Sequence, residues 1–146
     1  MIQYKQGNLL SVTEGVIVHG CNAQGVMGSG VALAVKSKYP KAYDAYIDFK
    51  TKQGLRLASL SIVKVTAKVY VANLISQETY GKDKLIKYVS YGAIHLGFEK
   101  LHGHFPISAV FNFPKIGAGL GNGDWKEISK LIELACPERD LVCWEV

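Results

Sequence analysis

Several features that identify common classes of protein are missing from this chain of 146 residues. No apolar run approaches the ~20 residues that a membrane-spanning helix needs. The opening residues, MIQYKQG, contain too short an apolar stretch for a secretory signal peptide. The three cysteines are odd in number and lack the close pairs typical of metal sites. We therefore expect one domain over residues 1–146, with reduced thiols, a cytoplasmic location, no membrane contact, no metal and no cofactor.

Acidic residues are also few. The 17 Lys and Arg residues exceed the 12 Asp and Glu residues and give a net charge of +5, which favours anionic ligands. The lysines form no long basic block, and aromatic residues do not alternate with them as they do on a base-stacking surface. The charge therefore predicts an anionic ligand but no direct sequence-specific binding of nucleic acid.

The apolar pattern predicts strands that alternate with helices. β-Branched and aromatic residues indicate strands over residues 2–5, 15–19, 59–65, 69–75, 110–113 and 141–145. Apolar residues at helical spacing indicate helices over residues 29–38, 40–52, 84–101 and 125–135. This alternation predicts an α/β layered fold. Because too few residues join the third and fourth strands for a crossover helix, we expect a mixed central sheet.

Two glycine-rich segments each follow a predicted strand and precede a predicted helix. They are residues 20–30 (GCNAQGVMGSG) and residues 117–124 (GAGLGNGD). Neither has the GxGxxG spacing of a dinucleotide fingerprint or the GK[ST] of a P-loop. Glycine allows the backbone to approach a ligand closely, and a helix N-terminus presents free N–H groups to phosphate. Because ligands bind at the carboxyl ends of strands in α/β sheets, the pair predicts a clamp for a diphosphate.

Together with their flanking residues, these segments resemble the macro domain family. The resemblance is carried in order by Gly7-Asn8-Leu9-Leu10, by residues 18–32, and by Pro114-Lys115-Ile116 followed by residues 117–125. The residues of the two segments are most similar to those of the branch that contains ADP-ribose-1″-phosphate phosphatases and the human terminal ADP-ribose glycohydrolase. The resemblance implies a three-layer α/β/α macro domain with a mixed sheet and an ADP-ribose cleft at the carboxyl edge of that sheet.

The resemblance also assigns ADP-ribose-binding positions. Asn8, where the family usually has Asp, would accept a hydrogen bond from the adenine amino group, or it would only shape the turn. Asn22 would contact the distal ribose, or it would only hold its loop as an Asx-turn. Trp144 would stack on adenine or pack in the core. The other implied positions are Leu9, Gly28, Ser29, Gly30, Val31, Ile116, Gly117, Ala118, Gly119, Leu120 and Gly121.

Asp124, Asn22 and His19 are the candidate catalytic residues. The resemblance implies that Asp124 acts at the distal ribose, or orients and activates water in a phosphatase. Asp124 followed three residues later by Glu127 is also typical of a helix cap. His19 has a side chain that can transfer protons near neutral pH, and the alternative is a hydrogen-bonded core histidine.

One position departs from the glycohydrolase branch, which has a Lys where this chain has Gln77. Glutamine supplies no positive charge and forms no Schiff base, so a mechanism that depends on that lysine is not expected. Lys82 or Lys84, in the following loop, could reach the site instead.

These observations predict a domain that binds ADP-ribose and hydrolyses the phosphate of ADP-ribose-1″-phosphate, and therefore an ADP-ribose-1″-phosphate phosphatase. One alternative is an ADP-ribosyl glycohydrolase that acts on modified protein or nucleic acid, with an ADP-ribosylated macromolecule as its partner. The other alternative is a non-catalytic reader of ADP-ribose, in which Asp124 serves only as a cap.

Overall fold

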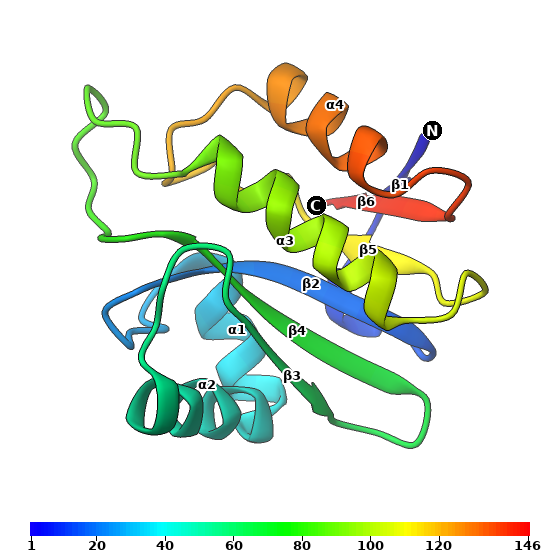
Figure 1. Ribbon diagram of the computed structural model, residues 1–146, viewed down its shortest axis with the longest axis horizontal. Coiled ribbons are helices and arrows are strands. Elements are labelled where there is room, and N and C mark those ends of the chain that lie inside the picture. The colour runs from blue at the N-terminus through cyan, green and yellow to red at the C-terminus, as the bar shows by residue number, and fades with distance from the viewer.

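A computed structural model describes all residues from Met1 to Val146. Its centre is one six-stranded sheet with the strand order β1-β6-β5-β2-β4-β3 (Figure 1). The strands are β1 (Ile2–Gln6), β2 (Gly15–Asn22), β3 (Leu60–Lys64), β4 (Val69–Gln77), β5 (Phe111–Phe113) and β6 (Leu141–Glu145). The helices are α1 (Gly30–Lys38), α2 (Pro40–Gln53), α3 (Tyr91–His104) and α4 (Trp125–Ala135), with a short 3₁₀ helix η1 (Leu9–Ser11).

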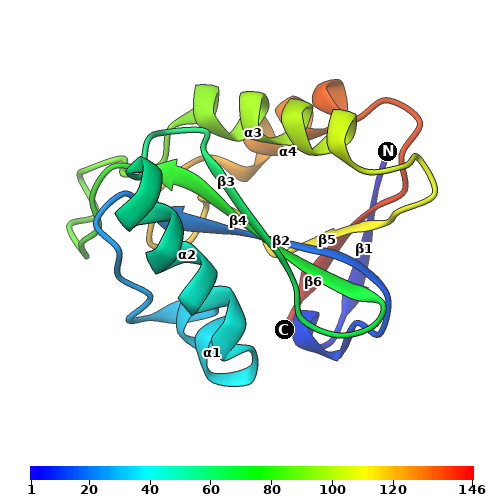
Figure 2. The same cartoon turned by 60° about the horizontal axis from the view of Figure 1, so that its bottom comes forward.

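Helices cover both faces of this sheet. Figure 2 shows α3 and α4 on one face and α1 and α2 on the other. Neighbouring strands are parallel except β3 and β4, which form the expected antiparallel pair. The prediction of a three-layer α/β/α fold with a mixed sheet is therefore confirmed. None of the helices combines the length and the apolar character needed to cross a membrane.

The central strand β2 supplies side chains to both cores. Val16 and Val18 belong to the large cluster beneath α3 and α4, whereas Ile17 belongs to the cluster beneath α1. This division follows from the alternation of side chains along a strand. All three residues are almost completely inaccessible to solvent, so β2 is covered on both faces.

The predicted helix over residues 84–101 was wrong at its start, because α3 begins at Tyr91. Val89 is buried and pairs with Gln77 in an isolated antiparallel bridge, which keeps the preceding residues out of the helix. Ser90 then caps α3, since its hydroxyl accepts a hydrogen bond from the N–H of Ala93 at 3.2 Å. The apolar side chains of Leu85 and Ile86, which suggested a helix, lie exposed on the loop.

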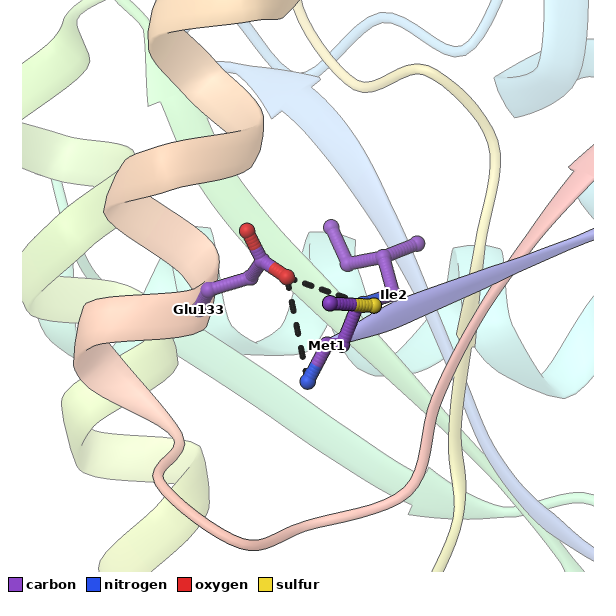
Figure 3. A network of polar contacts seen from close by, with 3 residues as sticks. All are labelled: Met1, Ile2 and Glu133. Carbon is purple, nitrogen blue, oxygen red and sulfur yellow. Dashed lines mark hydrogen bonds and ion pairs between the residues drawn. The ribbon is translucent and has the colours of Figure 1, made fainter.

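The edge strand β1 is tied to α4 by one carboxylate (Figure 3). The N–H of Ile2 donates to Glu133 Oε2 at 3.0 Å, and the Met1 amine lies 3.7 Å from the same oxygen. These contacts join the first strand to the last helix, and this helix directly follows the second glycine segment.

A buried arginine holds the C-terminal end of α3. Arg139 is only 3% exposed, and its guanidinium stacks 4.2 Å from the centre of the Phe111 ring. Its nitrogen atoms donate to His102 Nδ1 and to the backbone carbonyls of His102, Phe105, Pro106 and Ala109. A cation at this place satisfies the free carbonyls at the helix end and interacts favourably with the helix dipole.

We predict that Arg139→Lys lowers the free energy of unfolding by about 3 kcal/mol, because an ammonium has too few donors and the wrong geometry for these acceptors. The matched control is Arg56→Lys, which changes the other, exposed arginine and leaves stability unchanged. Urea unfolding of the two variants checks this prediction, and equal stabilities would contradict it.

Candidate functional site

A cleft of about 700 Å³ opens at the carboxyl ends of β2, β4 and β5. Both glycine segments contribute to its wall, as the sequence predicted for the carboxyl edge of the sheet. The predicted binding residues that line it are Asn22, Gly28, Ser29, Gly30, Val31, Ile116, Gly117, Gly119, Leu120 and Gly121. The fold therefore brings residues from two distant parts of the sequence to one cavity.

Residues with unpaired backbone N–H groups line this cleft from both segments. In the first segment, the amides of residues 28–32 donate to no group of the chain. In the second, the amides of Gly117, Gly119, Leu120 and Gly121 likewise have no acceptor within the protein. An amide without an acceptor is a donor available to a ligand, and clusters of such amides bind anions.

The N-terminus of α1 adds the positive end of a helix dipole to the same wall. Ser29 occupies its cap position in an extended conformation, yet its hydroxyl makes no capping hydrogen bond. By contrast, α3 and α4 are capped by the side chains of Ser90 and Asp124. The α1 terminus is thus left open for a negatively charged group.

The first segment is fixed from below by Tyr46 on α2. The Tyr46 hydroxyl is fully buried, donates to the backbone oxygen of Asn22 at 2.5 Å, and accepts from the N–H of Gly25 at 3.1 Å. The Asn22 amide closes the loop, because Nδ2 donates to the Val26 carbonyl and Oδ1 accepts from the N–H of Gln24. One hydrogen of Nδ2 stays free for a ligand.

The second segment folds back on itself. Gly123 donates its N–H to the Gly117 carbonyl at 2.7 Å, and the N–H of Tyr88 donates to the Gly121 carbonyl at 2.9 Å. Gly117 has φ of +78°, and a Cβ at this position would lie 2.5 Å from Val89 Cγ2. Glycine is therefore required at position 117 by both conformation and space.

The charges of the cleft are all positive. Lys82 and Lys115 line it, whereas no Asp or Glu does. Lys115 Nζ lies 3.2 Å from Glu145 Oε2, so part of its charge is neutralised. The site thus presents amides and lysine side chains, a combination that suits a phosphorylated ligand.

His19 lies outside the cleft lining, in the core below it. It is completely buried, and its Nε2 lies 2.6 Å from Asn73 Oδ1. Burial lowers the pKa of His19 from 6.5 to about 4, so the ring is neutral at physiological pH. Burial also raises the pKa of the Cys21 thiol, whose Sγ lies 3.7 Å from His19 Nε2. The contacts of His19 are those of the alternative interpretation, a hydrogen-bonded core histidine.

Asp124, the last residue of the second segment, also lies outside the lining. Its Oδ1 accepts a hydrogen bond from the N–H of Lys126 at 2.9 Å, and its own N–H donates to the Tyr91 hydroxyl. This is the geometry of a helix cap. Its Oδ2 makes no hydrogen bond or ion pair with the chain, so one carboxylate oxygen is unoccupied.

The residues predicted for the adenine side do not line the cleft, and their assignments stay predictions. Asn8 Oδ1 caps η1 by accepting from the N–H of Leu10 at 2.9 Å, and Leu9 is buried. Trp144 is half-buried against the core cluster beneath α1, and its Nε1 donates to Asn112 Oδ1 at 3.0 Å. Ala118 belongs to the second segment but is absent from the lining.

Of the lining residues on the β4 side, the sequence pointed to Lys82 as one that could reach the site, but it gave no role to Gly20 or Ser76. Ser76 is almost fully buried, and a Cβ on Gly20 would lie 2.6 Å from its Oγ, so the two strands approach closely here. Gln77 is paired with Asn22 in the parallel ladder, and Tyr80 and Lys82 follow on the loop. These residues could have been identified from the parallel pairing of β4 with β2, because the carboxyl ends of the two strands then lie at the same edge of the sheet.

The fold and the cleft define an α/β/α domain with an anion-binding site. No protein-family model matches the chain. An ADP-ribose 1″-phosphate phosphatase of Meyerozyma guilliermondii is 26% identical over 161 residues, which cover 90% of this chain and 92% of that protein. A DNA ADP-ribosyl glycohydrolase of Mycobacterium tuberculosis is 25% identical over 150 residues, which cover 99% of this chain and 42% of that longer protein.

Solved structures give the same result. A macrodomain protein from Streptomyces coelicolor superposes with a TM-score of 0.81 at 25% identity, over 100% of this chain and 99% of that one. The resemblance to the macro domain family that the two glycine segments indicated is therefore confirmed.

The buried His19 predicts a specific dependence of stability on pH. Between the ordinary pKa of 6.5 and the folded-state pKa of about 4, the unfolded chain binds a proton that the folded chain does not. The free energy of unfolding therefore falls as the pH drops through this range, with up to about 3 kcal/mol due to His19.

Urea unfolding at several pH values between about pH 7 and about pH 4.5 measures this dependence. His19→Gln keeps a side-chain donor for Asn73 but does not titrate, so its stability falls less steeply over the same range. The slope, and not the absolute stability, is the readout, since the substitution also changes packing. Identical slopes for the two proteins would refute the prediction.

Proposed function

We propose that this protein binds ADP-ribose and hydrolyses the phosphate ester of ADP-ribose-1″-phosphate. The observation that carries the proposal is the set of unpaired amides that face one cleft from both glycine segments. These amides, the open N-terminus of α1 and the two lysines form a positively polarised site with the dimensions of a nucleotide pocket. The match to phosphatases along most of the chain supports the choice of substrate.

In this proposal, the two segments hold the diphosphate and Asn22 contacts the distal ribose through its free Nδ2 hydrogen. Water then forms a bond to phosphorus, the bond between phosphorus and the ribose oxygen breaks, and that oxygen takes up a proton. The amides stabilise the charge that develops on the phosphoryl oxygens. Asn8, Leu9 and Trp144 would act at the adenine end after local rearrangement. Ala118 would act with its neighbours in the second segment on phosphate and ribose.

Asp124 is the acid that we propose to orient or activate the water. No Asp, Glu or His lines the cleft, and Asp124 is the carboxylate at the end of the second segment. Its Oδ2 is available while Oδ1 caps α4. The neutral, buried His19 would act only by supporting the floor of the cleft. We also propose a cytoplasmic location, which the three free, buried cysteines support.

A charge placed at Gly119 tests ligand binding. A Cβ at this position meets no atom within 4 Å, so Gly119→Glu folds normally while its carboxylate lies at the anion-binding segment. We expect calorimetric titration to show that affinity for ADP-ribose falls by roughly tenfold or more. Gly103→Glu, at an equally open position on α3, is the matched control and keeps full affinity. Absence of ADP-ribose binding by the unmodified protein would overturn the proposal.

The role of Asp124 is tested by Asp124→Asn, which removes the charge but keeps a good cap. We expect stability to change by less than about 0.5 kcal/mol and phosphate release to fall by roughly tenfold or more. Unchanged phosphate release at retained stability would show that Asp124 is only a cap.

An ADP-ribosyl glycohydrolase is the second candidate, because the relatives of that name match nearly the whole chain. Gln77 lines the cleft but carries no charge, and its Nε2 donates to the Thr79 carbonyl at 2.8 Å. Phosphate release from ADP-ribose-1″-phosphate, measured beside release of ADP-ribose from modified protein and modified DNA, separates the two activities. Binding without either activity would indicate a reader.

A further inference from the structure

One cation of the cleft has no partner in the protein. The four ion pairs of the chain join Met1 to Glu133, Lys52 to Asp48, His95 to Glu99 and Lys115 to Glu145. Of the two lysines that line the cleft, only Lys82 is therefore unpaired. It also makes no hydrogen bond through its side chain, so its ammonium is free to bind an anion.

The loop that carries Lys82 is anchored to the anion-binding wall. This loop joins β4 to α3 and lies at the left of Figure 1, in green. Asn122 Nδ2 donates to the carbonyls of Asp83 and Ile86 at 2.8 and 2.7 Å. Asn122 itself has φ of +60°, a conformation that asparagine tolerates better than most residues. The position of Lys82 is thus coupled to the second glycine segment.

The acids nearest in sequence are not arranged to neutralise Lys82. Asp83 Oδ1 accepts a hydrogen bond from the N–H of Leu85 at 2.9 Å, which turns this carboxylate into its own loop. Glu78 takes part in no ion pair. Gln77 donates to the Thr79 carbonyl, which shapes the start of the loop. A lysine held at a cleft wall without a counter-ion is suited to a ligand that brings its own negative charge.

We propose that Lys82 determines specificity by binding the terminal phosphate of ADP-ribose-1″-phosphate. This inference rests on the proposed function and extends it to the choice between two ligands. The diphosphate, common to both ligands, is served by the unpaired amides of the two segments. The terminal phosphate carries additional charge, and an ammonium is a strong point-charge partner for it. Lys82 then distinguishes the phosphorylated ligand from ADP-ribose itself.

The experiment compares affinities for the two ligands in three variants of the full chain. Lys82→Met removes the charge and keeps much of the length of the side chain. We expect its affinity for ADP-ribose-1″-phosphate to fall by roughly tenfold or more, while affinity for ADP-ribose changes by less than about threefold. Lys82→Arg keeps the charge, so we expect it to keep most of the preference for ADP-ribose-1″-phosphate over ADP-ribose. Lys84→Met, two residues along the same loop and outside the cleft lining, leaves both affinities unchanged.

The ratio of the two affinities decides the result. An unchanged ratio in Lys82→Met overturns the inference, and so does an equal loss of both affinities, which would place Lys82 at the diphosphate. Because Lys82 is exposed, thermal unfolding of each variant matches that of the unmodified protein. Failure of the unmodified protein to bind ADP-ribose would instead refute the proposed function.

Discussion

The constraint on which this structure depends is the need to keep a group of backbone amides unpaired at one edge of the sheet. Unpaired amides are unfavourable when they are buried, so the chain must hold them where a ligand or solvent reaches them. Other bonds therefore fix the two segments. Tyr46 holds the first from below, and the Gly123–Gly117 and Tyr88–Gly121 hydrogen bonds hold the second. These bonds occupy the carbonyl oxygens of Asn22, Gly117 and Gly121. The N–H groups of residues 28–32 and of Gly117, Gly119, Leu120 and Gly121 stay free.

The sheet explains why two segments so far apart in sequence act together. β2 is flanked by β4 and β5, and all three strands are parallel, so their carboxyl ends meet at one edge. The packing of β2 into cores on both faces gives this edge a rigid base. Arg139 fixes the C-terminal end of α3 by its hydrogen bonds to backbone carbonyls. The N-terminal end of the same helix follows the loop that carries Lys82.

The sequence predicted the parts of this arrangement that local chemistry determines. The glycine segments, the strand β2 and the helical spacing of apolar residues in α4 all follow from residue type and spacing, and the structure has them. The start of α3 could not be predicted, because Leu85 and Ile86 fit a helical pattern and only the bridge of Val89 to β4 excludes it. The environment of His19 likewise depends on Asn73, which lies 54 residues away.

Backbone groups and side chains have different roles in the cleft, and this difference determines how much of the function can be inferred. Backbone amides bind phosphate whatever side chains surround them, so the diphosphate clamp is specified by glycine positions and by the fold. Selectivity and catalysis depend on individual side chains, and here the chain has Gln77 where its resemblance to the glycohydrolase branch implies a Lys. Glutamine removes a positive charge from the end of β4, whereas Lys82 places one on the wall a few residues further along. Since Coulomb interactions in such a cleft depend strongly on distance, the proposed role of Lys82 stabilises a different part of a bound ligand and leaves the proposed diphosphate clamp intact. In this proposal the same clamp can serve different ligands, and the loop after β4 sets which one this chain prefers.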